Sequence, residues 1–210
     1  KKGVLMPKKS KLVTIPLKPI LHILCEGSKT EPQYFYQYIN RFCRVPVRVK
    51  VEKTKRNTPL ELVKEAIKLK KKSPSCDVFW IVYDRESEIN CSEYIHQQVR
   101  DIAKTNGIQI AISNICFEVW LLLHYTKSIP QCDSCLALTN RREFQENFPR
   151  YSKNAEIHFS REDIDNAREN AKKMNQRTIS GSDSSWNVPS KWNPYTNVYE
   201  VLDSIDRFTS

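Results

Sequence analysis

Glycine is scarce in this sequence of 210 residues, which contains only 4 glycines. Loops that cradle phosphate groups through backbone NH groups need several glycines in close succession. Residues 27–30, Gly-Ser-Lys-Thr, resemble the end of a nucleotide-binding P-loop, but the upstream glycine and the Gly-Lys step are missing. A glycine-rich phosphate cradle is therefore nearly excluded.

Long apolar segments are also missing. No apolar run reaches the roughly 20 residues that a membrane-spanning helix needs, and no signal-peptide pattern opens the sequence. We therefore expect a cytoplasmic protein that has no membrane partner.

Cysteines occur, but without a clear framework. The 7 cysteines are an odd number, are scattered and mostly stand beside apolar residues, which favours reduced thiols over disulfides. Cys132 and Cys135 have the spacing of a zinc knuckle, but no second pair follows at the usual distance. Either His124 or His158 could complete a zinc site; the alternative is a free pair of thiols in a loop.

Positive charge is what the sequence has in excess. Lysine and arginine number 34 against 24 acidic residues, a formal net charge of +10 that favours a polyanionic partner such as nucleic acid. Residues 1–19 form a basic N-terminal arm without any acid, which is either disordered or edge-lying, or contacts nucleic acid. We expect further nucleic-acid contacts from basic side chains elsewhere: Lys29, Arg85, Arg141, Arg142 and Lys172.

Alternating strand and helix patterns occupy residues 20–125. Thr30 with Gln33, and Thr58 with Glu61, have the spacing of capping boxes at two helix starts. This alternation predicts an α/β core with a parallel sheet of about four strands flanked by helices. Four apolar runs are interpreted as its strands: residues 20–25, 45–51, 77–84 and 108–113.

Residues 126–210 are predicted to form a mostly helical C-terminal extension packed on the core. Ser160 and Thr196 each begin a helical spacing of apolar residues. Residues 180–193 form a polar loop with two tryptophans, Trp186 and Trp192. Such a loop is a surface tether, a partner site or a base-stacking site.

Acidic side chains stand at the predicted ends of two strands. Glu26 follows the first strand, and Asp84 and Glu86 follow the third, so a parallel sheet would bring them to one edge. In an extended segment Asp84 and Glu86 would point the same way. Clustered carboxylates repel unless a cation lies between them, and their oxygens suit Mg²⁺ or Mn²⁺, which can polarise a phosphodiester and activate water. The alternative for each acid alone is a solvated loop or a charged turn.

Residues 115–124 are apolar on almost every side, which predicts a buried helix. Glu118 lies inside this segment and needs a cation or strong donors, because an unpaired buried carboxylate is costly. We expect Glu118 to reach the same edge as a further metal ligand. His124 is either a satisfied core histidine or a ligand.

The motifs resemble those of known families. Glu26, Asp84 and Glu86 resemble the acids of the Toprim domain, the fold shared by topoisomerases, bacterial primases and overcoming-lysogenisation-defect nucleases. More narrowly, the chain resembles the RloB-like (AbiLii-type) family over most of residues 20–205. The matching segments are Cys25-Glu26-Gly27, Thr30-Glu31-Pro32, Tyr34-Phe35, Val82-Tyr83-Asp84-Arg85, Ser113-Asn114, residues 116–124, Tyr151-Ser152-Lys153 and Asn193-Pro194-Tyr195-Thr196.

This resemblance implies a bacterial or archaeal anti-phage protein, the nuclease effector beside a partner ATPase of the ABC or overcoming-lysogenisation-defect type. It implies an Mg²⁺- or Mn²⁺-dependent endonuclease acting on DNA or RNA, tRNA included, and it allows a homo-oligomer. Glu26 would be the general acid/base or a metal ligand, Asp84 and Glu86 would hold the metal, and Glu118 would hold a second ion or be a further ligand of the first. Lys153, and less directly Lys29, would stabilise charge on the phosphate.

A catalytically inactive Toprim-like module is the alternative. The Toprim pattern has aspartate where this sequence has Glu86, which is longer by one methylene group. Such a module would bind nucleic acid or regulate the ATPase without cleaving. A topoisomerase or primase is disfavoured, because the chain has no room for a tyrosine-bearing cleavage domain.

Overall fold

The structure is a computed structural model that describes residues 18–55, 58–154 and 156–210. The basic arm predicted over residues 1–19 lies outside the described residues except for its last two positions. Among the helices that are described, none combines the length and the apolar character that crossing a bilayer demands.

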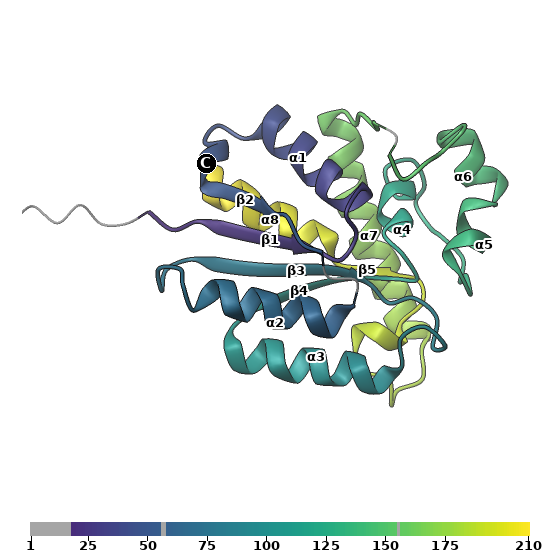
Figure 1. The fold of residues 1–210 in the computed structure, drawn as a ribbon. Coiled ribbons are helices and arrows are strands. Elements are labelled where there is room, and N and C mark those ends of the chain that lie inside the picture. The colour runs from purple at the N-terminus through teal and green to yellow at the C-terminus, as the bar shows by residue number, and fades with distance from the viewer. Residues whose placement is uncertain (1–17, 56–57, 155) are drawn as a thin grey trace, which may run out of the picture.

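A five-stranded sheet forms the centre of the molecule, in the order β2-β1-β3-β4-β5 (Figure 1). The pairs β1–β2, β1–β3 and β3–β4 are parallel, as predicted, and β4–β5 is antiparallel. The strands are β1 (Leu21–Cys25), β2 (Val49–Glu52), β3 (Val78–Asp84), β4 (Gln109–Asn114) and β5 (Tyr195–Thr196). The fold is thus the predicted α/β class with a helical C-terminal region.

Helices cover both faces of the sheet, so each face has its own hydrophobic cluster. One face packs against α2 (Pro59–Lys70) and α3 (Glu93–Asn106). The other face packs against α1 (Thr30–Phe42), α4 (Glu118–Leu122), α7 (Arg161–Gly181) and α8 (Val198–Thr209). The short helices α5 (Cys135–Thr139) and α6 (Arg142–Asn147) lie beyond the carboxyl ends of the parallel strands (Figure 1).

Two of the helix starts agree with their sequence signals, and a third does not. Thr58 precedes α2 and its hydroxyl accepts a hydrogen bond from the backbone NH of Glu61 at 3.3 Å. Ser160 forms a capping box with Asp163 at the start of α7. Thr30, however, is the first residue of α1 and not its cap. Its hydroxyl instead donates to the carbonyl oxygen of Lys153 at 3.2 Å, which ties the start of α1 to the C-terminal extension.

Two element boundaries differ from the sequence prediction. The strand predicted at residues 45–51 is Val49–Glu52, because Pro46 begins a 3-10 turn (Pro46–Arg48) in front of it. Thr196 belongs to β5 and not to the last helix, which begins after Asn197. The Asn197 side chain accepts from the NH of Ile112 at 2.8 Å, which fixes this crossing on β4.

The segment predicted as a buried helix, residues 115–124, is buried throughout, although only Glu118–Leu122 is α-helical. His124 at its end is only 2% exposed. Its Nε2 lies 3.1 Å from the Tyr34 hydroxyl, its Nδ1 lies 3.0 Å from the carbonyl oxygen of Leu121, and burial lowers its pKa to about 4. His124 is therefore a satisfied core histidine.

Candidate metal centre

The carboxyl ends of β1 and β3 meet, as the parallel arrangement requires. Cys25 pairs with Val82 in the ladder, and the backbone NH of Glu26 donates to the carbonyl oxygen of Val82 at 2.9 Å. Asp84 then ends β3, and its backbone NH donates to Oε2 of Glu26 at 3.3 Å. Two acids separated by 58 positions are therefore neighbours at the sheet edge.

An open cleft of about 290 Å³ lies at this edge. Its wall includes Glu26, Asp84, Glu86, Lys29 and Lys153, all five of which the sequence had marked as site residues. The backbone of Glu86 differs from the extended conformation that was predicted for it, because its φ of 54° lies in the left-handed region. The turn is held by its NH, which donates to the carbonyl oxygen of Ile115 at 3.0 Å.

A further acid in the cleft, Glu31, was missed by the sequence assignment. It lies in the first turn of α1, is only 7% exposed and lines the cleft with Glu26 and Asp84. Its carboxylate folds back over Gly27, where a Cβ would collide with it. A side chain at position 27 would therefore displace the Glu31 carboxylate from its place in the cleft. The sequence signal was present in the matching segment Thr30-Glu31-Pro32, but no role had been given to it.

The acids of the cleft disfavour one another's charge. Burial, with the nearby charges of Glu86 and Glu31, raises the pKa of Glu26 to about 8. Burial and the charges of Glu31, Glu118 and Glu26 raise the pKa of Asp84 well above its usual range. The pKa of Glu31 is raised as well, mainly by burial. Each shift reports a carboxylate that lacks sufficient positive charge nearby.

Little positive charge lies close to the carboxylates of the cleft. In the described parts of the chain, no lysine, arginine or histidine lies within ion-pair distance of Glu26, Glu31 or Asp84. Lys153 opposes the rise in the pKa of Asp84 and Glu31, but only by its charge from a greater distance. Hard oxygen ligands converging from separate chain segments, without a salt bridge between them, fit the donor set that Mg²⁺ or Mn²⁺ prefers.

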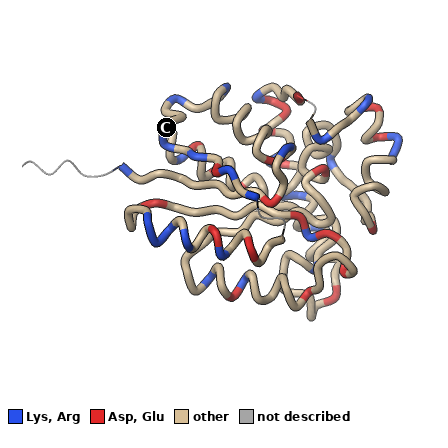
Figure 2. Tube along the Cα trace, in the orientation of Figure 1, with Lys and Arg blue, Asp and Glu red and all other residues tan. Residues whose placement is uncertain are grey.

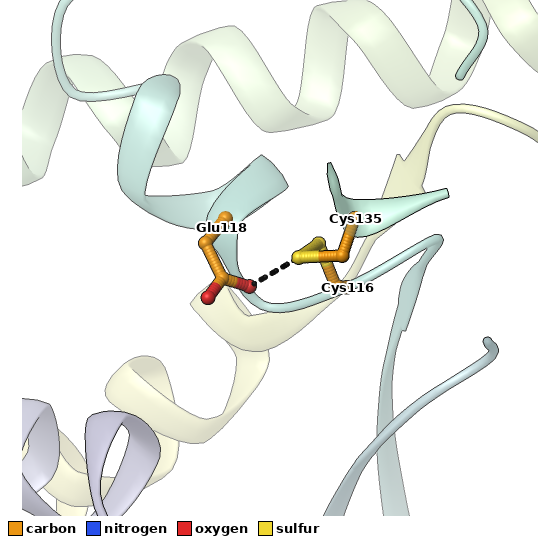
Figure 3. Close-up of side chains that lie close together, drawn as sticks. All are labelled: Cys116, Glu118 and Cys135. Carbon is orange, nitrogen blue, oxygen red and sulfur yellow. Dashed lines mark hydrogen bonds between the residues drawn. A yellow bond between two sulfur atoms is a disulfide. The ribbon is translucent and has the colours of Figure 1, made fainter. Parts of the chain in front are cut away.

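Glu118 lies behind the cleft and is 2% exposed. Its Oε1 accepts a hydrogen bond from the Tyr151 hydroxyl at 2.9 Å, and its Oε2 lies 3.2 Å from Sγ of Cys135 (Figure 3). Its charge raises the pKa of both Asp84 and Glu31, so it belongs to the same electrostatic cluster. Glu118 does not line the cleft, and the predicted role of direct metal ligand stays a prediction.

Cys135 pairs with Cys116 and not with Cys132. The structure contains a Cys116–Cys135 disulfide, so the prediction of reduced thiols is wrong for this pair. Cys132 is free and its Sγ lies 3.4 Å from the carbonyl oxygen of Pro130. Cys116, Glu118 and Cys135 could together offer three ligand atoms within 4.8 Å of one another (Figure 3). Metal binding there requires the reduced thiolates, so the disulfide and such a site exclude each other.

Breaking the disulfide should lower stability without unfolding the protein. Cys135→Ala is expected to reduce the free energy of unfolding by about 2–3 kcal/mol, because the bond closes a loop with a sequence separation of 19 residues. Urea unfolding with and without a thiol reductant measures this, and the reductant should lower the midpoint of the wild type and of the Cys91→Ser control but not that of Cys135→Ala. Cys91→Ser, at a free and partly exposed cysteine, is the matched control. Equal midpoints of wild type with and without reductant would contradict the disulfide.

The basic residues predicted to contact nucleic acid lie in different places. Figure 2 shows lysine and arginine spread over all layers of the molecule. Lys29 lines the cleft. Arg141 and Arg142 are exposed at the start of α6, and Lys172 lies over the Tyr199 ring at 5.2 Å.

Arg85 is buried, and its guanidinium already donates hydrogen bonds to other parts of the protein. Its Nε donates to the carbonyl oxygen of Ser190 at 2.8 Å, and Nη1 donates to the carbonyl oxygen of Cys91 at 3.0 Å. It also forms an ion pair with Glu88. Arg85 thus joins the loop after β3 to the loop after α7, and these bonds leave it little capacity to contact a phosphate.

Comparison with known proteins gives one match. A family model described as RloB-like protein matches residues 21–205, well over half of the chain. Neither a search among curated proteins nor a search among solved structures gave a match.

Proposed function

The chain belongs to the RloB-like protein family, and from this membership we propose that it is a metal-dependent endonuclease of anti-phage defence. The proposed reaction is the hydrolysis of a phosphodiester bond in DNA or RNA with Mg²⁺ or Mn²⁺. Control by a partner ATPase of the ABC or overcoming-lysogenisation-defect type is part of the proposal.

The observation that carries this proposal is the set of acids in the cleft without a paired cation. Glu26, Glu31, Asp84 and Glu86 come from two strand ends and a helix start, and they line one cleft. In the absence of a cation, repulsion between these carboxylates lowers the stability of the folded protein. Such a cluster lies at the carboxyl edge of a parallel sheet, where ligands bind in open α/β folds, and this position supports a site for a divalent ion.

Each side chain has a role that its surroundings support. Asp84, Glu86 and Glu31 would hold the metal, which supplies charge neutralisation and a more acidic water when bound. Glu26, whose pKa is raised to about 8, can hold or release a proton near neutral pH and is suited to general acid/base work. Lys153 stands at the same cleft and can offset negative charge on a phosphate.

A catalytically inactive module is the second candidate, and one feature of Glu86 favours it. This residue is exposed and sits on a left-handed backbone, one methylene longer than the aspartate of the Toprim pattern. A longer, exposed carboxylate holds a metal less firmly. The inactive module would bind nucleic acid, or regulate the ATPase, without any affinity of the cleft for Mg²⁺.

Metal binding and cleavage can be measured separately to test the two candidates. We expect Mg²⁺ and Mn²⁺ at millimolar concentrations to raise the melting temperature, because they bind the folded cleft and relieve its repulsion. In the same buffers we expect cleavage of at least one substrate from a panel of single-stranded and duplex DNA, RNA and tRNA. The panel is assayed with and without the ATPase. Stabilisation by Ca²⁺, without cleavage, would serve as the matched control for metal binding alone.

Two outcomes would contradict the nuclease proposal. Absence of any shift in melting temperature with Mg²⁺ or Mn²⁺ would contradict the metal site and favour the inactive module. A shift without cleavage of any member of the panel, with or without the ATPase, would leave a metal site but contradict the nuclease.

A further inference from the structure

A second hollow adjoins the acidic cleft. It has a volume of about 810 Å³ and is lined by the loops after β3 and β4, the end of α7, and the loop that includes Trp186. Glu86 lines both hollows, so a strand whose phosphate lies among the acids can continue past Glu86 into the second one. We call this second hollow the Trp186 groove, and its volume is in the range of ordinary ligand pockets.

The two tryptophans of the loop after α7 have different surroundings. Trp192 donates from Nε1 to the carbonyl oxygen of Trp186 at 3.0 Å, and its ring packs against Tyr195 at 5.3 Å between centroids. It therefore tethers the loop. Trp186 is 43% exposed and lines the groove. Of the interpretations open for this loop, the tether applies to Trp192, whereas Trp186 presents a free aromatic surface.

The loop that carries Trp186 is anchored at several points. Ser190 is 2% exposed, its carbonyl oxygen accepts from Arg85 at 2.8 Å, and its hydroxyl lies 2.6 Å from Nη1 of Arg100. The amide of Asn193 donates to the carbonyl oxygen of Cys132 at 2.8 Å. The bond with Arg85 places the loop after α7 beside the loop after β3, and residues of both loops line the groove. The course of the two loops can be followed in Figure 1. The tryptophan is thus held in position before any ligand arrives, which lowers the entropic cost of binding.

Two acidic residues of the groove are paired with arginines. Glu88 forms an ion pair with Arg85, and Glu93 pairs with Arg100 at 2.8 Å. Asp183 accepts a hydrogen bond from the backbone NH of Ser185 at 2.8 Å, and hydrogen bonds from Ser185 lower its pKa, so it stays charged. Glu88 and Glu93 therefore add less negative potential to the groove than unpaired carboxylates would.

Two basic residues of the groove remain available. Arg177 and Lys191 are exposed, and the ion pairs found in the described ranges include neither of them. Glu86, Asp133 and Asp183 outnumber them, so the groove as a whole carries a small net negative charge. A groove with one exposed aromatic ring and only two available cations suits an uncharged base, with contacts to one or two phosphates at its rim, better than a continuous run of phosphates.

We propose that the Trp186 groove binds an unpaired nucleobase, stacked on Trp186, from the same nucleic acid whose phosphodiester lies in the acidic cleft. This inference rests on the proposed function. A base can enter the groove only when it has left its pair, so the ligand is a single-stranded or unpaired segment of RNA or DNA. Stacking on an aromatic side chain is sequence-tolerant and strengthens binding about ten-fold per base.

Binding can be measured without cleavage. The probes are short single-stranded RNA and DNA of one sequence, and the duplex of that sequence. They are titrated in the presence of a chelator against the full chain carrying Asp84→Asn. We expect Trp186→Ala to weaken binding of a single-stranded probe about ten-fold, and Trp186→Phe to retain most of the affinity. Tyr36→Ala is the matched control, because Tyr36 is 42% exposed on α1 and lies outside the groove.

A spectroscopic readout separates stacking from a merely structural role. Base stacking should quench tryptophan fluorescence, and the quenching should disappear in Trp186→Phe, because Trp80 and Trp120 are buried and Trp192 is half-buried against Tyr195, outside the groove. Replacing Arg177 and Lys191 together by alanine should flatten the slope of log affinity against log salt by about 1.4, as expected for two phosphate contacts on a single strand. The RNA and DNA probes then show which backbone the groove prefers.

The outcomes distinguish this inference from the proposed function. Cleavage by the wild type, together with an unchanged affinity in Trp186→Ala, would overturn the stacking site and leave the nuclease in place. Quenching at Trp186, together with no cleavage by the wild type of any member of the nucleic-acid panel, would support the stacking site and overturn the nuclease. Equal affinity for duplex and single strand, or no binding at all, would overturn the stacking site.

Discussion

Asp84→Asn is expected to abolish metal-dependent cleavage, by about a thousand-fold or more, while the protein remains folded. Asp84 ends β3 between Glu26 and the turn at Glu86, and its pKa is raised by burial and by the charges of Glu31, Glu118 and Glu26. Asparagine keeps the shape of the side chain but removes the charge that a divalent cation needs. Initial rates in Mg²⁺ and in Mn²⁺ measure the loss.

The same substitution should not destabilise the metal-free protein. Because the acids of the cleft repel one another, removing one charge relieves repulsion, and the melting temperature in a chelator should stay equal or rise. Asp101→Asn, at an exposed position on α3 outside the cleft, is the matched control and should retain activity. Undiminished cleavage by Asp84→Asn would contradict a role of the cleft in the reaction.

Glu26→Gln is expected to stabilise the metal-free protein, increasingly so as the pH rises. The pKa of Glu26 is raised from its usual 4.5 to about 8, so the folded state binds its proton more tightly than the unfolded state does. The associated stability is complete below pH 4.5 and is lost as the pH rises through 8. Glutamine cannot ionise and avoids this loss. At pH 8 the variant should therefore be more stable by about 2–3 kcal/mol, after allowance for partial exposure.

Urea unfolding at pH 5, 7 and 8 in a chelator measures this effect. The difference between variant and wild type should be small at pH 5 and should grow toward pH 8. Glu146→Gln, at an exposed residue paired with Arg142, should show little dependence on pH over the same range. Adding Mg²⁺ at pH 8 should narrow the gap, because the cation stabilises the wild type more than the variant. A constant difference across the pH range would contradict the raised pKa of Glu26.

The ends of the central strands could be predicted because each strand is a mainly apolar run that stops at an acid. This holds for β1 before Glu26 and for β3 at Asp84. A parallel sheet then brings such ends together whatever the loops do. The pairing of β1 with β3 confirms that arrangement.

The features that sequence reasoning missed depend on tertiary contacts. A glutamate in the first turn of a helix is ordinarily explained by the helix dipole, so Glu31 gave no separate signal. The strand β5 is only two residues long and carries no periodicity. The Cys116–Cys135 bond joins cysteines of unremarkable spacing, which meet only after α5 has packed beside α4. The exposure of Trp186, in contrast to Trp192, likewise depends on how one loop is anchored.

The cleft is assembled from residues that lie between positions 26 and 153. The hydroxyl of Thr30 donates to the carbonyl oxygen of Lys153, and the hydroxyl of Tyr151 donates to the buried carboxylate of Glu118. A chimera that borrowed only the first 125 residues would inherit the acids but neither the lysine nor the tyrosine that accompany them. The cleft is therefore not modular, and swapping segments between homologues should preserve it only when the two portions are exchanged as a pair.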